Sequence, residues 1–197
     1  MHFLRKIAVV LGLVSIANIS FAAAPQYHEI IEGSPSAKLV VQEFASITCP
    51  HCAEFNNNDY PELKKRYIDT GKIQFIFRDI PTAPGNLAVA AAAIARCAPE
   101  GRGRGLIDMM YKHQVEWMRN PNMLRGYVQL AGMSGDDVDA CLNSEAIRNA
   151  MQESINRSTT TYKITQTPTF YVGDTKFAYT GFQELCDLID KCLGKTK

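Results

Sequence analysis

Residues 39–52 read LVVQEFASITCPHC, an apolar run followed by two cysteines with two residues between them. The first part, Leu39–Phe44, is rich in valine and bulky apolar residues and has the composition of a buried strand. Residues that favour helices follow Cys52, so the cysteines stand where a strand gives way to a helix. We expect Cys49 at the helix N-terminus and Cys52 one turn inside, a layout typical of thiol–disulfide redox centres.

This position predicts an acidic Cys49 thiol. The free backbone N–H groups of His51 and Cys52 would face its sulfur, and Pro50 suits the first helical position because no N–H is needed there. Such hydrogen bonds and the helix dipole would lower the pKa from about 8.5 by roughly one to three units, and His51 acts in the same direction. Cys49 is the predicted attacking thiolate and Cys52 the resolving thiol.

Two other interpretations of the cysteine pair stay open. A structural disulfide is one, although so short a loop removes little conformational entropy from the unfolded chain. A zinc site is the other, but it would need a second cysteine pair or histidines at ligand spacing. The nearest candidates are His28, His113 and isolated cysteines, so we expect no metal and no cofactor.

The first 22 residues have the pattern of a cleaved secretory signal peptide. Two basic residues precede an apolar run over 7–17, and the small residues Ser20 and Ala22 stand before the expected cut. An uncleaved anchor is the alternative, but a spanning helix needs about 20 apolar residues. Cleavage changes the net charge from +1 to −1, which argues against nucleic acid as a partner. Six cysteines, all after the leader, fit an oxidising compartment, and we expect the periplasm.

The order of elements predicts the fold class. A second strand is expected at Ile73–Phe77, after a helix that bends near residues 56–58 or Pro61 and ends by Gly71. A hairpin of strands over 169–179 and a final helix over 182–192 close the chain. Between these two parts the sequence has only helical periodicity. This is an α/β fold, thioredoxin-like, with an all-helical domain inserted between its βαβ and ββα halves.

We accordingly expect three domains besides an irregular lead-in over 23–37. They are the signal peptide (1–22), a thioredoxin-like domain (23–83 and 164–197) and the inserted helical domain (84–163).

Local signals within the insert give three further predictions. Asn86 is expected to cap its first helix, and Ser134 with Asp137 resembles a capping box. The glycine-rich stretch 101–105 is expected to be a mobile connector between helices.

On these residues the chain resembles the DsbA family of exported thiol–disulfide oxidoreductases. The resemblance spans the mature chain and rests on the Cys49–Cys52 motif, the preceding Glu43, the helical insert and the run Thr167-Pro168-Thr169-Phe170. It implies a cis peptide bond before Pro168, beside the active disulfide, and contact between the Thr167 backbone and bound substrate. An ordinary strand-entry proline is the alternative.

The resemblance also implies that Glu43 is a buried acid that assists proton transfer. A carboxyl whose pKa is raised by burial can accept the proton of a buried thiol. A solvated glutamate on a strand edge is the alternative. Asn56 and Asn57 stand where many relatives carry acids, and Thr167 where strong oxidases carry valine, so the reduction potential does not follow by analogy.

The remaining cysteines fall into two groups. The resemblance implies a second disulfide, Cys97–Cys141, in the helical domain, with two free thiols as the alternative. Cys186 and Cys192 stay open: the even number of cysteines favours pairing. Six residues of intact helix, however, span about 9 Å, more than the roughly 7 Å that a disulfide allows between Cα atoms.

The predicted function is oxidation of reduced, unfolded exported proteins by exchange through Cys49 and Cys52. The Pro-His dipeptide between the cysteines marks oxidising members of the family, and the resemblance implies a DsbB-like membrane reoxidant. A disulfide isomerase or reductase of the same fold is the second choice, and a peptide-binding chaperone without a redox role the third. No dimerisation segment is evident, so a monomer is expected.

Overall fold

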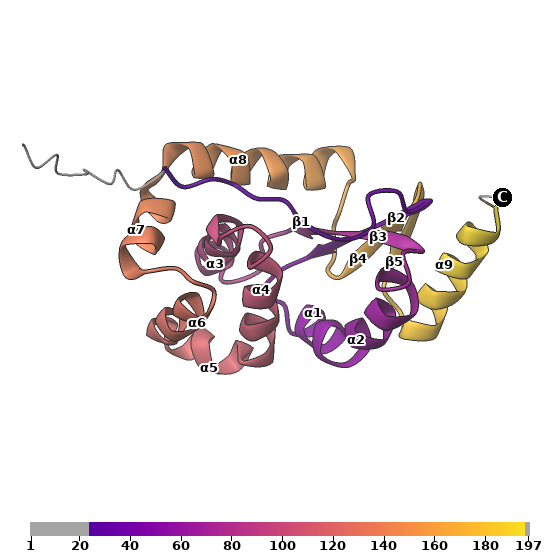
Figure 1. Ribbon diagram of the computed structural model, residues 1–197, viewed down its shortest axis with the longest axis horizontal. Helices are drawn as coiled ribbons and strands as arrows, with labels where there is room; N and C mark the ends of the chain where they lie inside the picture. The colour runs from indigo at the N-terminus through magenta and orange to yellow at the C-terminus, as the bar shows by residue number, and fades with distance from the viewer. Residues whose placement is uncertain (1–23, 196–197) are drawn as a thin grey trace, which may run out of the picture.

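The computed structural model describes residues 24–195 and is built on a five-stranded mixed sheet (Figure 1). The strands lie in the order β1-β3-β2-β4-β5. The central pair, β2 (Leu39–Ala45) and β3 (Ile73–Asp79), is parallel. Three antiparallel strands complete the sheet: β1 (Ile30–Gly33) beside β3, β4 (Thr169–Val172) beside β2, and β5 (Thr175–Ala178) beside β4.

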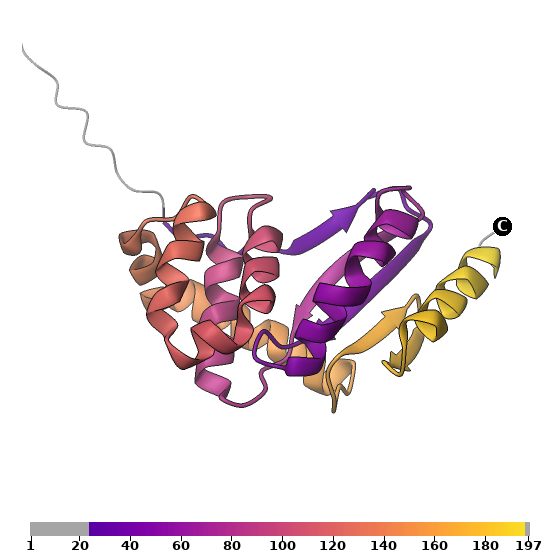
Figure 2. The ribbon, with the colours of Figure 1, turned by 90° about the horizontal axis from the view of Figure 1, so that it is seen from below.

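The segment that joins β2 to β3 is helical and alternates between α and π geometry. Its parts are α1 (Pro50–Glu54), η1 (Phe55–Asp59), α2 (Tyr60–Leu63) and η2 (Lys64–Ile68). The first π segment coincides with the bend that the sequence predicts, since Pro61 lacks the N–H of a regular α turn. Gly71, at φ +70°, follows its end. Figure 2 shows this helix lying along the sheet.

The crossover helix and the last helix share one apolar core with the sheet. Helix α9 (Phe182–Lys195) contributes Leu185 and Ile189, which are buried with Phe55 and Leu63 of the crossover segment. Alternate residues of β2 point into this core, as expected for a strand with its two faces in different surroundings. Glu43 is one of these positions, which places its carboxyl beneath the crossover helix.

A block of helices fills the chain between β3 and β4. Its elements are α3 (Gly85–Cys97), α4 (Gly103–Lys112), α5 (Gln114–Arg119), η3 (Pro121–Met123), α6 (Leu124–Leu130), α7 (Gly135–Asn143), α8 (Glu145–Asn156) and η4 (Arg157–Thr161). Most of them gather at the end of the molecule opposite α9, while α8 and η4 lead back toward the sheet (Figure 1). The capping box at Ser134 and Asp137 is confirmed, and Ser144 caps α8.

Three local predictions are wrong. The lead-in is not irregular throughout, because Ile30–Gly33 forms β1; a four-residue edge strand gives little periodicity, and its pairing with β3 is a tertiary contact. Asn86 does not cap α3, which begins at Gly85 with Pro84 as its N-cap residue and no side-chain cap. The glycine-rich connector is shorter than expected, because α4 begins at Gly103. A Cβ at Gly103 would lie 2.5 Å from the Ala95 carbonyl oxygen, so glycine there permits close helix packing.

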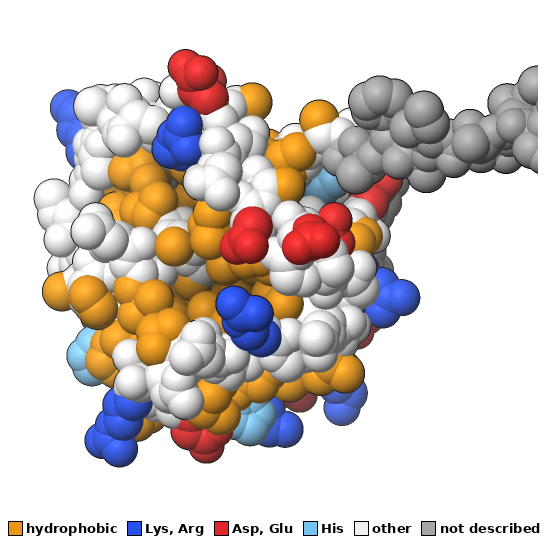
Figure 3. All heavy atoms as spheres, turned by 90° about the vertical axis from the view of Figure 1, so that its left-hand side faces the viewer, with side chains coloured by type: hydrophobic (Ala, Val, Ile, Leu, Met, Phe, Trp, Pro, Cys, Tyr) orange, Lys and Arg blue, Asp and Glu red, His pale blue; other side chains and the backbone are white. Residues whose placement is uncertain are grey.

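Cys97 and Cys141 form a disulfide that joins α3 to α7, with their Cα atoms 6.2 Å apart. Near this bond, α3, α6 and α7 line a hollow of about 320 Å³. Figure 3 shows apolar side chains gathered in the hollowed surface at this end of the molecule. The covalent link therefore fixes α7 where packing between the helices is incomplete.

Helix α9 decides the question of the last two cysteines. It runs unbroken to Lys195, past Cys192, rather than ending near residue 192. Cys186 and Cys192 therefore stand about 9 Å apart along its axis, too far for a disulfide between them. The expected signal peptide lies outside the described residues. Within residues 24–195, no helix has both the length and the apolar character needed to cross a bilayer.

Candidate active site

Cys49 occupies the position that the sequence predicts for it. It is the N-cap residue of α1, with extended backbone angles (φ −81°, ψ 122°), and Pro50 follows in the first turn. Its carbonyl accepts the first helical hydrogen bond, from the N–H of Ala53 at 3.1 Å. The side chain is 6% exposed, and its sulfur lies 3.6 Å from the carbonyl oxygen of Thr167. The sulfur thus lies at the surface edge of the core, between a helix N-terminus and the chain before β4.

The surroundings of this sulfur favour its anion. A hydrogen bond from the Cys52 thiol, together with the Thr167 side chain and the backbone N–H groups of Cys52 and His51, lowers the pKa of the Cys49 thiol to about 5, although burial opposes the change. The His51 imidazole itself is exposed and faces the Glu54 carboxylate at 3.7 Å. His51 therefore acts on the sulfur through its backbone.

Cys52 has the opposite properties. It is fully buried, and burial raises the pKa of its thiol far above the ordinary value. The nearby Cys49 sulfur and the Glu43 carboxyl act in the same direction. A protonated inner thiol beside an acidic outer thiol is the arrangement in which one sulfur attacks and leaves while the other resolves.

Glu43 lies beneath this pair and is buried rather than solvated, at 1% exposure. Both of its carboxylate oxygens are without a hydrogen-bond partner among the described residues. Burial raises the pKa of this carboxyl to about 8; Arg104 opposes the shift, and Asp108 and Cys49 add to it. Glu43 is therefore protonated near neutral pH and able to exchange a proton there.

The sequence did not reveal the polar cluster beside Glu43. Arg104 of α4 is buried and donates through Nη2 to the Asn56 side-chain oxygen and to the Asp108 carboxylate, the latter at 2.7 Å. Asn56 donates to the same carboxylate at 3.2 Å. The i,i+4 spacing of Arg104 and Asp108 is a recognisable helix signal. The glycines at positions 101, 103 and 105 mask this signal, because they favour a connector over a helix.

Two side chains of the insert hold the loop that carries Cys49. Gln114 of α5 donates to the carbonyl oxygens of Ile47 (2.8 Å) and Cys49 (3.0 Å). The Tyr111 hydroxyl of α4 donates to the carbonyl of Ser46 at 3.2 Å. Buried backbone carbonyls need such partners. The insert therefore positions the first cysteine directly, a role that no local sequence pattern indicates.

A groove runs beside the cysteines. The peptide bond between Thr167 and Pro168 is cis, as the resemblance implies, and a second cis bond precedes Pro84. Thr167 and Pro168, with residues of α1, η1 and the start of α9, line a groove of about 580 Å³ next to His51. Thr167 connects this groove to the redox pair, because its carbonyl oxygen lies 3.6 Å from the Cys49 sulfur.

The part of the chain that the structure describes contains no cluster of side chains suited to bind a metal ion. Within residues 24–195, no three His, Cys, Asp or Glu side chains gather as metal ligands would. His28 and His113, the candidates considered from the sequence, lie on different elements, the lead-in and the α4–α5 junction.

A family model described as Thioredoxin matches residues 26–191. Alpha-DsbA1 of Wolbachia pipientis is 25% identical, with a TM-score of 0.77 over 85% of this chain and 92% of that one. Oxidised BdbD of Bacillus subtilis, at 19% identity, shares the fold with a TM-score of 0.75 over 87% of this chain and all of that one.

Curated relatives are similar over most of this chain. A Rickettsia bellii protein, named for a protein-disulfide oxidoreductase activity, is 29% identical over 174 residues, which is 86% of this chain. Disulfide bond formation protein D of Bacillus subtilis is 23% identical over 167 residues, 81% of this chain and 74% of that protein. The chain spans 66% of the length of the R. bellii relative and 62% of its Rickettsia felis counterpart.

Proposed function

The chain belongs to the thioredoxin family and within it to the DsbA-like proteins, and on this basis we propose that it is a thiol–disulfide oxidoreductase that introduces disulfide bonds into exported, unfolded proteins. The observation that carries the proposal is the asymmetry of the cysteine pair. Cys49 is held as an anion at a helix N-terminus, and Cys52 is buried and protonated. A thiolate that is stable in the reduced enzyme makes the oxidised enzyme a strong acceptor of electrons.

The exchange proceeds in two steps. A substrate thiolate attacks the Cys49 sulfur of the Cys49–Cys52 disulfide, the bond between the two cysteines breaks, and Cys52 leaves. A second substrate thiolate then attacks the substrate sulfur of the mixed disulfide, and Cys49 leaves as a thiolate. The substrate loses two electrons and gains a disulfide, and the enzyme becomes the dithiol. The low pKa of Cys49 makes it a good leaving group in the second step.

Glu43 supplies the proton that the first step requires. Cys52 leaves as a thiolate in a buried site where its anion is strongly disfavoured. A protonated Glu43 gives up its proton, and the carboxylate takes it back when Cys52 is oxidised again. Its pKa of about 8 lies close enough to neutral pH for both directions.

The remaining assignments of the proposal concern substrate, partner and place. The Thr167 backbone and Pro168 would bind an extended substrate in the groove beside Cys49, with Pro50 and His51 shaping the helix end. Reoxidation would come from a DsbB-like membrane protein, and the enzyme would act as a monomer in the periplasm after loss of residues 1–22. The thioredoxin-like domain (23–83 and 164–197) would carry the chemistry, and the inserted domain (84–163) would cover it.

The test is oxidation of a reduced, unfolded ribonuclease by the oxidised protein in excess. The proposal predicts disulfide formation and recovery of ribonuclease activity at a rate well above that of air oxidation. Cys49→Ala should oxidise nothing. Failure of the wild-type protein to oxidise the substrate would overturn the proposal. Equal suppression of aggregation by wild type and Cys49→Ala, without oxidation, would instead indicate a chaperone.

A disulfide isomerase is the second candidate, and the Thr167 side chain is the observation that favours it. Its hydrogen bond to the Cys49 sulfur adds a polar contact next to the mixed disulfide, which would alter the release of substrate. The same ribonuclease with scrambled disulfides distinguishes the two functions. Repair of scrambled ribonuclease faster than oxidation of the reduced form would support the isomerase.

A further inference from the structure

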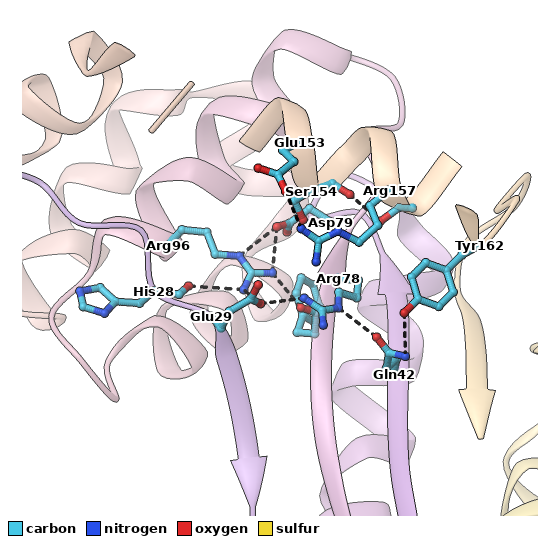
Figure 4. A network of polar contacts seen from close by, with 12 residues as sticks. His28, Glu29, Gln42, Arg78, Asp79, Arg96, Glu153, Ser154, Arg157 and Tyr162 are labelled. Atoms are coloured by element: carbon cyan, nitrogen blue, oxygen red, sulfur yellow. Dashed lines mark hydrogen bonds and ion pairs between the residues drawn. The ribbon is translucent and has the colours of Figure 1, made fainter. Parts of the chain in front are cut away.

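Two buried arginines reach from the inserted helices toward the sheet, and only one has partners for its whole side chain. Arg96 of α3 donates through Nε to Asp79 at 2.9 Å and through Nη2 to the Phe77 carbonyl at 2.8 Å. Its Nη1 lies 3.5 Å from both Glu29 and the His28 carbonyl. Figure 4 shows this closed network, which continues through Arg78 and Gln42. Arg96 therefore ties α3 to β3.

Arg104 is also buried, although 8% of it is exposed against none of Arg96, and it is incompletely bonded. Its Nη2 donates to Asn56 and Asp108, while Nε and Nη1 make no hydrogen bond among the described residues. Nε forms only an ion pair with Glu32, at 3.4 Å. The guanidinium lies over the Tyr60 ring, with its central carbon 3.9 Å from the ring centroid. These contacts fix the charge in place and leave Nη1 without a hydrogen bond or ion pair to another described residue.

Glu43 is the incompletely bonded group of opposite sign. Both of its oxygens lack hydrogen-bond partners, although the residue is buried. Its register partner on the neighbouring strand is Phe77, whose side chain points to the same face of the sheet. The Arg104 guanidinium lies 5.9 Å from the centroid of that Phe77 ring. The cation and the acid thus share one compartment beneath Cys52, where uncompensated charges are costly.

We propose that Arg104 is a positioning residue for the redox exchange: held by Asn56 and Asp108, its fixed charge sets how readily Glu43 gives and takes the Cys52 proton. The inference rests on the proposed function for its catalytic meaning. The inserted domain then takes part in the redox exchange, because Arg104 on α4 supplies the positive charge near Glu43 on β2.

Several charged or titratable groups act on this compartment. Those that face Glu43 are Cys49 and Cys52 from the start of α1, and Arg104, Asp108 and Tyr111 from α4; Glu32 and Tyr60 face Arg104. Arg104 favours the carboxylate, whereas Asp108 and the Cys49 thiolate favour the protonated acid. Removal of Arg104 and removal of the Asp108 charge must therefore change the acidity of Glu43 in opposite directions.

The experiment titrates Glu43 directly. In reduced protein labelled with ¹³C at the glutamate carboxyl carbons, the Glu43 signal is identified by its absence in Glu43→Gln. We expect Arg104→Met to raise the midpoint by at least about one pH unit, the size typical of a lost neighbouring charge. Arg104→Lys keeps the charge and should stay close to wild type, and Asp108→Asn should lower the midpoint. Arg102→Met, an exposed arginine just before α4, is the matched control and should change nothing.

Three results would overturn the inference: no shift in Arg104→Met, a shift in Arg104→Lys as large as that in Arg104→Met, or a rise in Asp108→Asn. Loss of packing alone cannot produce shifts of opposite sign, so a purely structural role is distinguished. If Arg104→Met does not fold, the lysine variant and Asp108→Asn decide. The titration needs no substrate, so a failure of the proposed oxidation would leave its result standing.

Discussion

Cys97 and Cys141 come from two helices and close a stretch of chain with a sequence separation of 44, whereas Cys49 and Cys52 lie within one turn of a single helix. The first pair is surrounded by apolar side chains of the helical block. The second pair has backbone donors at one sulfur and a buried acid beneath the other. All four cysteines belong to or pack against the same apolar cluster, so what separates the two pairs is the polarity of the groups around their sulfurs.

The difference teaches that the role of a cysteine here follows from the groups that stabilise or destabilise its anion. In apolar surroundings neither sulfur of a disulfide can leave as a stabilised thiolate. Such a disulfide therefore persists as a link between helices. A bond whose outer sulfur is a stable anion exchanges readily. If this is right, a substitution at one pair should change redox activity and a substitution at the other should change stability.

Replacement of the outer cysteine should abolish the redox activity completely. We expect Cys49→Ala to lose all oxidation of reduced ribonuclease, because within residues 24–195 no other cysteine is the N-cap residue of a helix. Its fold, measured by circular dichroism, should be unchanged. Residual oxidation above the air control would show that the other cysteines also exchange.

Removal of the other pair should act on stability alone. In the chain-entropy model, a disulfide that closes a loop of this length stabilises the fold by about 4 kcal/mol. We expect the double variant Cys97→Ala/Cys141→Ala to lose about that much in urea unfolding and to oxidise ribonuclease at nearly the wild-type rate at a temperature where it is folded. A strongly reduced rate in the folded variant would mean that the second disulfide also tunes the active site.

The pH dependence of the free energy of unfolding reports the titration of Glu43, the acid beneath the redox pair. In the reduced enzyme the folded-state pKa of Cys49, about 5, lies below its unfolded value, so its contribution to stability grows as the pH rises above 5. The folded-state pKa of Glu43, about 8, lies above its unfolded value, so its contribution is lost as the pH rises toward 8. Each changes the free energy of unfolding by about 1.4 kcal/mol per pH unit, and the two nearly cancel.

Glu43→Gln removes one of these two opposing slopes. Relative to wild type, the free energy of unfolding of the reduced variant should rise by about 1.4 kcal/mol per pH unit between about pH 5 and 8. Urea unfolding at several pH values, with only the Cys49–Cys52 pair reduced, measures the difference. Parallel curves for variant and wild type would show that Glu43 does not titrate in this window.

The smallest effect concerns the residue before the cis proline. Thr167→Val keeps the shape of the side chain and removes one of several groups that stabilise the Cys49 thiolate. We expect the thiol pKa to rise by less than about one unit, and the equilibrium with glutathione to change by less than about tenfold. Equilibration in glutathione buffers measures the second quantity. An unchanged equilibrium would show that the helix N-terminus and Cys52 stabilise the Cys49 thiolate without help from Thr167.

The features of this molecule that depend on short-range sequence patterns could be predicted. The strand before Cys49, the position of Cys49 at a helix start, the all-helical character of the insert and the Ser134 capping box all follow from local residue order. The intact α9 decided the Cys186–Cys192 question, which the residues had left open.

What could not be foreseen depends on contacts between distant segments. Strand β1 exists because β3 offers it an edge. Gly103 permits close packing of α4 against α3 and does not mark a loop. Because glycines favour loops, the start of the helix that carries Arg104 is not evident from the sequence. Gln114 reaches the Cys49 loop only through the folding of the insert over the sheet. A single sequence gives no signal for such long-range pairs.

The most direct measurement is the titration of the Cys49 thiol in the reduced protein, followed by the ultraviolet absorbance of its thiolate, with Cys49→Ala as the blank. We expect one transition with a midpoint at about pH 5. A midpoint near 8.5, the value of an ordinary cysteine, would contradict it.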